Sequence, residues 1–184
     1  MDFNKHFHLE GKHAFLSASS YHWVRYDEDK MANTFLNAKA KQRGTELHNL
    51  AFDLIRLGVK LPSTKTTINQ YVNDAIGYRM TPEQVLVYSD NAFGTADAIG
   101  FRKNKLRIHD LKTGEHPASF EQLEIYAAFF CAEYGVRPFD IEIELRLYQN
   151  DEVLILDPER DKIFHILDRL TTFDKLINEL KAEL

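Results

Sequence analysis

The chain has 184 residues, of which 44% are hydrophobic and 28% are charged. These values are typical of a globular protein with one core, and we expect a single domain over residues 1–184. Its one cysteine, Cys131, excludes a disulfide framework and any four-cysteine metal or iron–sulfur site. The sequence lacks an apolar run of bilayer length and a basic, then apolar, secretory leader, which predicts a cytoplasmic protein without membrane contact.

The net charge of −5 is distributed unevenly along the chain. Residues 1–115 carry 16 Lys/Arg against 13 Asp/Glu, whereas residues 116–184 carry 7 against 15. Basic residues gather in two places, around 39–43 and around 102–107. A local basic surface, rather than the total charge, decides whether a phosphate backbone can bind. The pattern permits nucleic acid binding, although the solvated faces of ordinary elements would also produce it.

The first part of the chain, about 17–80, is predicted to be helical. Hydroxyl residues at 17–20 are suited to cap a helix that begins near Tyr21. Apolar residues recur at helical spacing over 31–58, where Gly58 is a plausible stop. A second helix is expected over 66–78, and residues 81–83 are expected to form a turn or a short helix start.

The second part predicts a sheet core over about 85–156. We expect strands at 85–88, 93–101 and 106–111, the last two joined by a turn at 103–104. A helix over 119–134 follows. Residues 141–147 alternate between apolar and charged, which predicts a strand with one wet face, and 153–156 is expected to pair with it. A last helix is expected over about 159–182. This order predicts an α/β fold of the α+β type, a mixed β-sheet flanked by helices.

Three charged residues stand out around the predicted hairpin: Asp97 in the middle of one strand, and Asp110 and Lys112 at the end of the next. Aspartate is a poor strand former, so its presence on both strands needs an explanation. Asp110 and Lys112 share a face because they are two residues apart, whereas His109 is expected to pack on the opposite face. Pairing through a turn near Asn104 brings the two aspartates nearly opposite each other.

Two opposed carboxylates repel each other unless a cation lies between them. Hard oxygen ligands favour Mg²⁺ or Mn²⁺, and such an ion can polarise a phosphoryl oxygen and lower the pKa of a bound water. Lys112 would then orient that water or stabilise charge that develops on the phosphate. Taken singly, each residue also has a structural explanation: Asp97 as a turn or edge residue, and Lys112 as a solvated strand end.

The spacing of Asp97 and Asp110-Leu111-Lys112 resembles the D…(D/E)-x-K signature of the PD-(D/E)XK nucleases. The segment 44–48, Gly-Thr-Glu-Leu-His, resembles the G-x-x-x-H helix motif of the RecB-like branch. The segment 122–126, Gln-Leu-Glu-Ile-Tyr, resembles the Q-x-x-x-Y motif of that branch. The resemblance covers roughly residues 15–150 and implies a restriction-endonuclease-like core.

The resemblance also implies roles for particular residues. His48, Asp97 and Asp110, with the carbonyl of Leu111, would ligate Mg²⁺ or Mn²⁺. A structural alternative for His48 is a helix histidine whose ring is satisfied by a neighbour.

Lys112 would be the catalytic lysine. Gln122 and Tyr126 are four residues apart on one helix face, and they would face the site and the DNA. Packing in the core is an equally weighted alternative for Tyr126.

The chain departs from part of the branch, because it lacks the four cysteines of the iron–sulfur members and a phosphate-binding loop of its own. It resembles a freestanding nuclease of the kind found in phage genomes. We therefore expect a Mg²⁺- or Mn²⁺-dependent deoxyribonuclease, an exonuclease in DNA recombination, repair or processing. Two alternatives stay open: a DNA-binding or regulatory protein that needs a partner for cleavage, and a nuclease that acts on RNA. Endonuclease activity, a homo-oligomer and a recombination partner protein also stay open.

Overall fold

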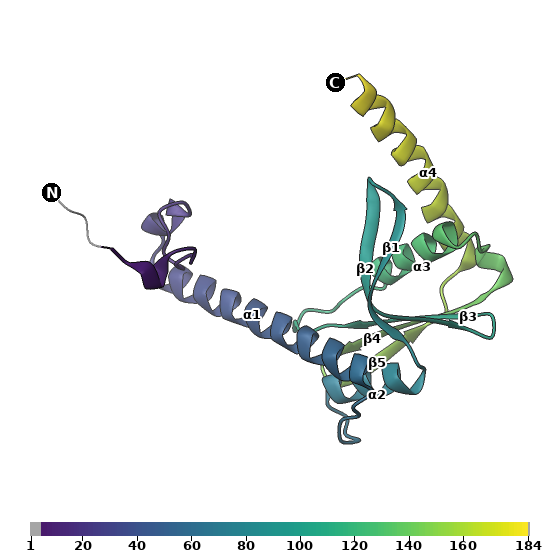
Figure 1. Cartoon of the computed structure of the whole chain (residues 1–184), viewed down its shortest axis with the longest axis horizontal. Coiled ribbons are helices and arrows are strands. Elements are labelled where there is room, and N and C mark those ends of the chain that lie inside the picture. The colour runs from purple at the N-terminus through teal and green to yellow at the C-terminus, as the bar shows by residue number, and fades with distance from the viewer. Residues whose placement is uncertain (1–4, 184) are drawn as a thin grey trace. The chain divides into compact units, whose positions relative to one another are not determined.

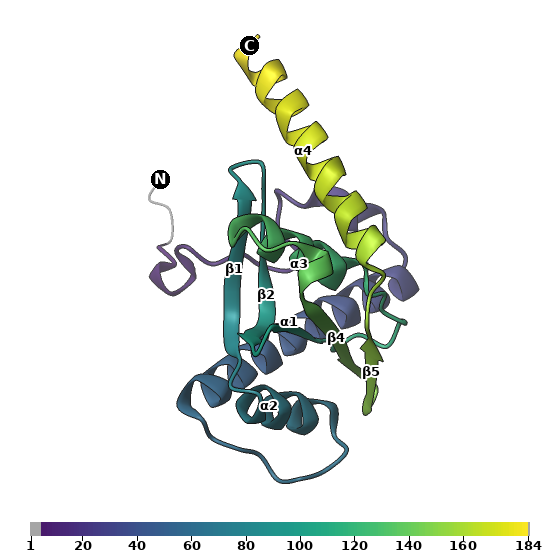
Figure 2. The ribbon, with the colours of Figure 1, turned by 90° about the vertical axis from the view of Figure 1, so that its right-hand side faces the viewer.

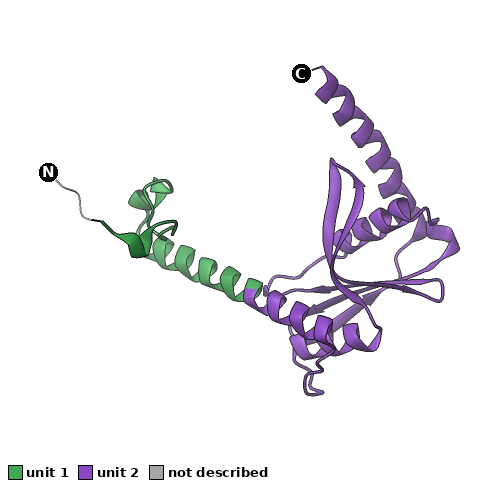
Figure 3. Ribbon diagram, in the orientation of Figure 1, with its two compact units in different colours: residues 1–45 green, residues 46–184 purple. Residues whose placement is uncertain are grey.

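A computed structural model of the chain describes residues 5–183. The first four residues, on which the expected absence of a secretory leader partly rests, lie outside this range. The described chain divides into two compact units, residues up to 45 and residues from 46 onward (Figure 3). Within the described range, no helix is both long enough and apolar enough to cross a membrane.

The first unit consists of two short 3₁₀ helices, η1 (Phe7–Leu9) and η2 (Tyr21–Arg25), and the first part of the long helix α1 (Glu28–Leu57). The predicted hydroxyl cap at 17–20 is wrong in detail, because the Ser20 side chain makes no capping bond to η2. Instead, the Ser17 hydroxyl accepts a hydrogen bond from the Ser20 amide, and the Ser17 carbonyl accepts one from the Trp23 indole. Asp27 caps α1 by accepting the amide hydrogen of Lys30 at 2.8 Å.

The second unit contains the rest of α1 and a five-stranded mixed sheet with its helices (Figures 1 and 2). The strands lie in chain order, and every neighbouring pair is antiparallel except β3 and β4, which are parallel. The expected α/β fold is confirmed. The elements after α1 are α2 (Thr67–Gly77), β1 (Thr81–Ser89), β2 (Ala92–Arg102), β3 (Lys105–Leu111), α3 (Glu121–Glu133), η3 (Pro138–Asp140), β4 (Glu142–Gln149), β5 (Glu152–Leu156) and α4 (Arg160–Ala182).

The sheet of the second unit has a hydrophobic cluster on each face. On one face, α3 and the start of α4 pack on the sheet, and residues such as Leu123, Ile163 and Leu145 are fully buried there. On the other face, α2 and the last turns of α1 cover the sheet through Val72, Ala51 and other small or apolar residues. The strand order places β3 at the centre of the sheet, and the predicted site lies at the end of this strand.

The predicted turn at 81–83 is wrong, because these residues begin β1. Proline has no amide hydrogen and is tolerated in a strand at its first residues or at a sheet edge, and Pro82 meets both conditions. The sequence signal was misleading here because a Thr-Pro-Glu segment is equally typical of a helix start.

The expected wet face of the strand at 141–147 holds at Glu142, whose side chain is 76% exposed, but not at Glu144 and Arg146. Arg146 on β4 is only 13% exposed in its side chain, and Glu144 only 15%. Helix α2 covers them, and Arg146 contacts the carboxylate of Asp74 at 3.3 Å and the hydroxyl of Tyr78 at 2.9 Å. The charges are compatible with this cover because they pair with one another.

Three of the apolar residues that recur at helical spacing in the helices predicted at 31–58 and 119–134 lie in solvent. Leu50 and Leu57 on α1 are 48% and 67% exposed, and Tyr134, just beyond α3, is 55% exposed. Their neighbours Ala51 and Ile55 are buried, as is Cys131. The helical spacing therefore found the correct elements but drew the buried faces too wide.

Candidate metal centre

The site begins where β2 and β3 separate. Their ladder ends at the pair Ala98 and His109, so Asp97 and Asp110 occupy the next opposed positions, in agreement with the register expected from the turn. There, Asp97 Oδ2 accepts the amide hydrogen of Leu111 at 2.9 Å, so a side chain replaces the backbone partner that the ladder no longer supplies. The two aspartates therefore meet at a fork in the sheet.

Asp110 is buried, with 2% of its surface exposed. Its Oδ2 forms an ion pair with the Lys112 ammonium at 3.0 Å. Burial, and then the charge of Asp97, raise the pKa of Asp110 to about 6. The Lys112 ammonium is therefore the cation that offsets the charge of this buried carboxylate.

His48 of α1 lies on the other side of Asp97, with Nδ1 at 3.6 Å from Asp97 Oδ2. Burial raises the pKa of Asp97, while the amide of Leu111 and the ring of His48 oppose that rise. The alternative of a helix histidine with a satisfied ring is therefore met only in part, because the neighbour that His48 contacts is a carboxylate whose own pKa is raised by burial.

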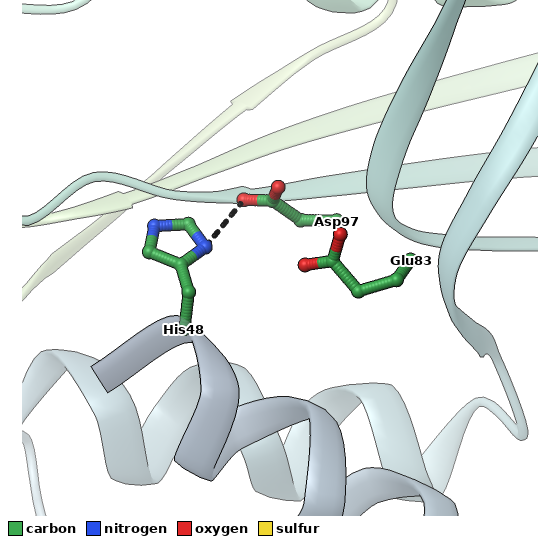
Figure 4. A group of neighbouring side chains, drawn as sticks. All are labelled: His48, Glu83 and Asp97. Atoms are coloured by element: carbon green, nitrogen blue, oxygen red, sulfur yellow. Dashed lines mark ion pairs between the residues drawn. The ribbon is translucent and has the colours of Figure 1, made fainter. Parts of the chain in front are cut away.

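Glu83 of β1 is a third carboxylate at this place, and the sequence interpretation missed it. Donor atoms of His48, Glu83 and Asp97 all lie within 4.8 Å of one another (Figure 4). The pairs Pro82–Ala98 and Gln84–Ala96 place Glu83 at the position opposite Asp97. The pairing of β1 with β2 could have identified Glu83 from the sequence, but no such pairing is considered once residues 81–83 are interpreted as a turn.

A chain of contacts leads from Asp110 to α3. The Lys112 ammonium donates to Gln122 Oε1 at 2.8 Å, and the Gln122 amide donates to the Tyr126 hydroxyl at 2.9 Å. The backbone of Lys112 is fixed as well, since its amide donates to the carbonyl of Tyr148 at 2.9 Å. The structure therefore brings Lys112, Gln122 and Tyr126 together beside Asp110.

The ring of Tyr126 packs in the core and its hydroxyl contacts Gln122, so both predicted roles, core packing and a position beside the site, apply to this residue. Only 9% of its surface is exposed, and its ring lies so close to β2 that a Cβ added to Gly94 would meet Tyr126 Cε1 at 2.9 Å. Glycine is required at position 94 by this close approach. The ring is thereby held in the core while its hydroxyl reaches Gln122.

The donor set fits a divalent cation. The carboxylates of Glu83 and Asp97 and the imidazole of His48 lie close together, Asp110 is at the next opposed position on β3, and such donors suit Mn²⁺ or Mg²⁺. Lys112 is the cation that contacts Asp110, but a single ammonium cannot compensate the charges of Glu83 and Asp97 as well. The role of the Leu111 carbonyl stays a prediction. The Leu111 side chain is buried, and its amide binds Asp97.

Two other predicted features lie away from the fork. His109 faces away from Asp110, as expected, and is fully buried against Tyr148, whose hydroxyl lies 3.2 Å from Nδ1. Burial lowers the pKa of His109 to about 3, so this ring is neutral and structural.

The basic residues at 102–107 line a cleft of about 360 Å³ at the turn between β2 and β3. Arg79, which follows α2, also lines this cleft beside Arg102, Lys103, Lys105 and Arg107. Lys105 and Arg107 are engaged by Glu144 at 2.8 and 3.3 Å. The first basic group, at 39–43, belongs to the other unit and is exposed on α1.

Comparisons of the chain with protein-family models, with curated proteins and with solved structures found no match.

Proposed function

We propose that the protein is a metal-dependent DNA nuclease of the PD-(D/E)XK type, RecB-like branch. The observation that supports it best is the contact chain Asp110–Lys112–Gln122 beside the Asp97–His48 pair. Residues that the resemblance had selected from four separate segments meet in one place. Such convergence is not expected if each residue had only the structural role that it could have alone.

The proposed chemistry is hydrolysis of a phosphodiester bond. His48, Asp97 and Asp110 would hold the divalent ion, which when bound polarises the phosphoryl oxygen and acidifies a water. Lys112 is aligned by Gln122 and Asp110, so its ammonium has a fixed direction from which to donate to the attacking water or to a phosphate oxygen. The Tyr126 hydroxyl accepts a hydrogen bond from the Gln122 amide, and Tyr126 therefore positions Lys112 indirectly, through Gln122.

Burial of Asp110 supports a role in binding rather than in proton transfer from bulk water. With 2% of its surface exposed, the carboxylate is shielded by the protein on most sides. Lys112 pairs with it at 3.0 Å, and a divalent cation within the fork is the further ligand that we propose.

The partner we propose is DNA, and the basic cleft is the feature that supports a phosphate-binding surface. Arg79, Arg102 and Lys103 contribute positive charge to it alongside the engaged pair Lys105 and Arg107. Changing both Arg102 and Lys103 to Ala should weaken DNA binding and reduce the slope of log affinity against log salt by about 2, since each lost phosphate contact removes about 1. An unchanged slope would exclude this cleft from the DNA-binding surface.

The test of the function is cleavage of linear and of covalently closed plasmid DNA with Mg²⁺ or Mn²⁺. Wild type is compared with Asp110→Asn and with the exposed turn variant Asp90→Asn as a matched control. We expect loss of linear DNA by wild type and the control, and at least a ~100-fold slower reaction for Asp110→Asn. Nicking of the closed circle as well would identify an endonuclease.

Two other outcomes would point to the alternatives. Binding of DNA without cleavage by folded protein would favour a regulatory protein that needs a partner. Faster cleavage of an RNA of the same sequence would favour a ribonuclease.

A further inference from the structure

We infer that the second half of α4 is a surface on which a second copy of this chain docks in antiparallel orientation. The surface consists of four large apolar side chains that remain 38–52% exposed, here called the apolar stripe: Phe173, Leu176, Ile177 and Leu180. This inference does not depend on the proposed function, because none of these residues belongs to the candidate metal centre.

The apolar stripe follows the spacing of one helix face. Counted from Phe173, its other members lie three, four and seven positions further along α4. With 3.6 residues per turn, all four side chains fall within about 100° around the helix axis. Single exposed apolar residues are common on protein surfaces, but a contiguous row at this spacing is the pattern with which one helix packs on another.

The first half of α4 packs on its own chain through apolar residues. Ile163 is fully buried, and Ile166, Leu167 and Leu170 pack against the hydrophobic cluster on the α3 side of the sheet. This contact ends at Leu170, whereas the helix continues to Ala182 and extends past α3 (Figures 1 and 2). The second half of α4 therefore lies outside both hydrophobic clusters of residues 5–183.

The second half of α4 contacts the turn between β1 and β2 through polar groups. Asp174 accepts hydrogen bonds from the Ser89 hydroxyl and from the Asn91 amide, the latter at 2.8 Å. Asn178 and Lys181 also contact the Asn91 side chain. Around the helix axis these polar residues lie about a third of a turn from the centre of the apolar stripe. The turn therefore fixes α4 without covering the stripe.

The arrangement of the apolar stripe favours a second copy as its occupant. The stripe is symmetric about the midpoint between Leu176 and Ile177. A two-fold axis at that point pairs Leu176 with Ile177 of the second copy, and Phe173 with Leu180 of the second copy. The same patch then serves both copies, as a two-fold symmetric interface requires.

Charges at the two ends of the apolar stripe select the antiparallel direction. The Arg169 guanidinium lies over the Phe173 ring, 4.2 Å from its centroid, and Glu183 follows the last turn of α4. Neither side chain forms an ion pair within residues 5–183. Both lie on the same flank of the stripe, so antiparallel pairing brings Arg169 of each copy close to Glu183 of the other. Parallel pairing would instead bring like charges to the same level, which is unfavourable.

The expected interface is small. Arg169 and Glu183 are 183 − 169 = 14 positions apart, which corresponds to about 21 Å of helix at 1.5 Å per residue. A contact of this length along one helix is at the low end of specific interfaces. We therefore expect a weak dimer with a dissociation constant in the micromolar range.

The test is sedimentation velocity of the full chain over a range of concentrations, without nucleic acid. Wild type should change from monomer to dimer as the concentration rises. Leu176→Glu should weaken association at least ~10-fold, because it places two carboxylates near the two-fold axis. Since Leu176 is exposed and glutamate is a good helix former, this variant should fold as wild type does. Leu50→Glu, at a leucine of α1 that is also 48% exposed, is the matched control and should associate as wild type does.

Charge reversal tests the direction of the two helices. Arg169→Glu and Glu183→Arg should each weaken association by roughly threefold, and the double variant should restore it, because opposite charges meet again. In a parallel dimer the single reversals would leave like charges side by side and change little.

Cross-linking gives a second measure of direction. A mixture of Phe173→Cys and Leu180→Cys chains should form a disulfide-linked heterodimer faster than either chain forms a homodimer. Two copies of position 173 would be about 10 Å apart along the axis, which is too far for a disulfide. Preferred homodimer cross-links would contradict the antiparallel arrangement.

Three other results would overturn the inference: a wild type that stays monomeric at every concentration, an equal loss of association in Leu176→Glu and Leu50→Glu, or charge reversals without effect. None of these experiments measures cleavage. A failure of the dimer therefore leaves the proposed function untouched, and a dimer without nuclease activity would reject only the proposed function.

Discussion

Asp110→Asn should stabilise the metal-free protein, and by an amount that grows with pH. The pKa of Asp110 is raised from 3.8 to about 6 in the fold, first by burial and then by Asp97. A carboxyl group with a raised pKa contributes stability that is complete below the unfolded pKa and is lost as pH rises through the folded one. Ionisation of Asp110 therefore lowers the free energy of unfolding of the wild type as pH rises from 4 to 7, whereas Asp110→Asn lacks this contribution.

The magnitude follows from the two pKa values. At 1.36 kcal/mol for each tenfold change in proton affinity, the ionised Asp110 costs about 3 kcal/mol at pH 8 and about 1.5 kcal/mol at pH 5. The advantage of Asp110→Asn in free energy of unfolding should therefore increase by about 1.5 kcal/mol between these two pH values. The side chain is 3% exposed, so solvent screening reduces this value little.

The assay is urea unfolding with a chelator at pH 5 and at pH 8, for wild type, Asp110→Asn and the exposed control Asp90→Asn. The control should show no growing advantage. Added Mg²⁺ should then stabilise the wild type more than Asp110→Asn, because an ion that binds only the folded state adds its binding free energy. A variant that is less stable than wild type at both pH values, or an advantage that does not change with pH, would refute the argument from burial.

Two further substitutions test the packing around the site. Gly94→Ala should lower the free energy of unfolding by about 1–3 kcal/mol and slow cleavage, because the new methyl group would lie 2.9 Å from the ring of Tyr126. In the same thermal melts, Gly77→Ala should be neutral or slightly stabilising, because no atom lies within 4 Å of the added methyl group. Arg146→Met should cost about 2 kcal/mol in urea unfolding, because it removes the ion-pair partner of Asp74 and one of the partners of Glu144. Arg137→Met, at a side chain that is 76% exposed, should change stability by less than about 0.5 kcal/mol. Equal effects within either pair would contradict the reasoning.

Periodicity and turn chemistry predicted the elements of this fold in the correct order. They succeeded because the two central strands are joined by a short turn, which fixes the register of Asp97 and Asp110 almost from the sequence alone. They failed where tertiary cover decides the outcome. The charged side chains of β4 look solvated in the sequence, and only the position of α2 shows that Arg146 is enclosed.

Glu83 shows a different limit. No spacing rule links it to Asp97, because the two residues meet through the pairing of β1 with β2, and the first residues of β1 have a turn-like sequence. Its φ of 49° is a property that the sequence does not express, since glutamate rarely adopts it. The candidate residues that a pattern could find are those that lie on regular elements.

The length of the hairpin formed by β2 and β3 determines which residues oppose each other at the fork. The separation of Asp97 and Asp110 is set by how many residues lie between them, and side chains within that stretch can change in size without altering which positions oppose each other. An insertion or deletion of one residue there would turn one aspartate to the other face of the sheet. This hairpin should therefore tolerate substitutions in its turn but no change in its length. A transfer of the site to another protein should keep the number of residues between Asp97 and Asp110.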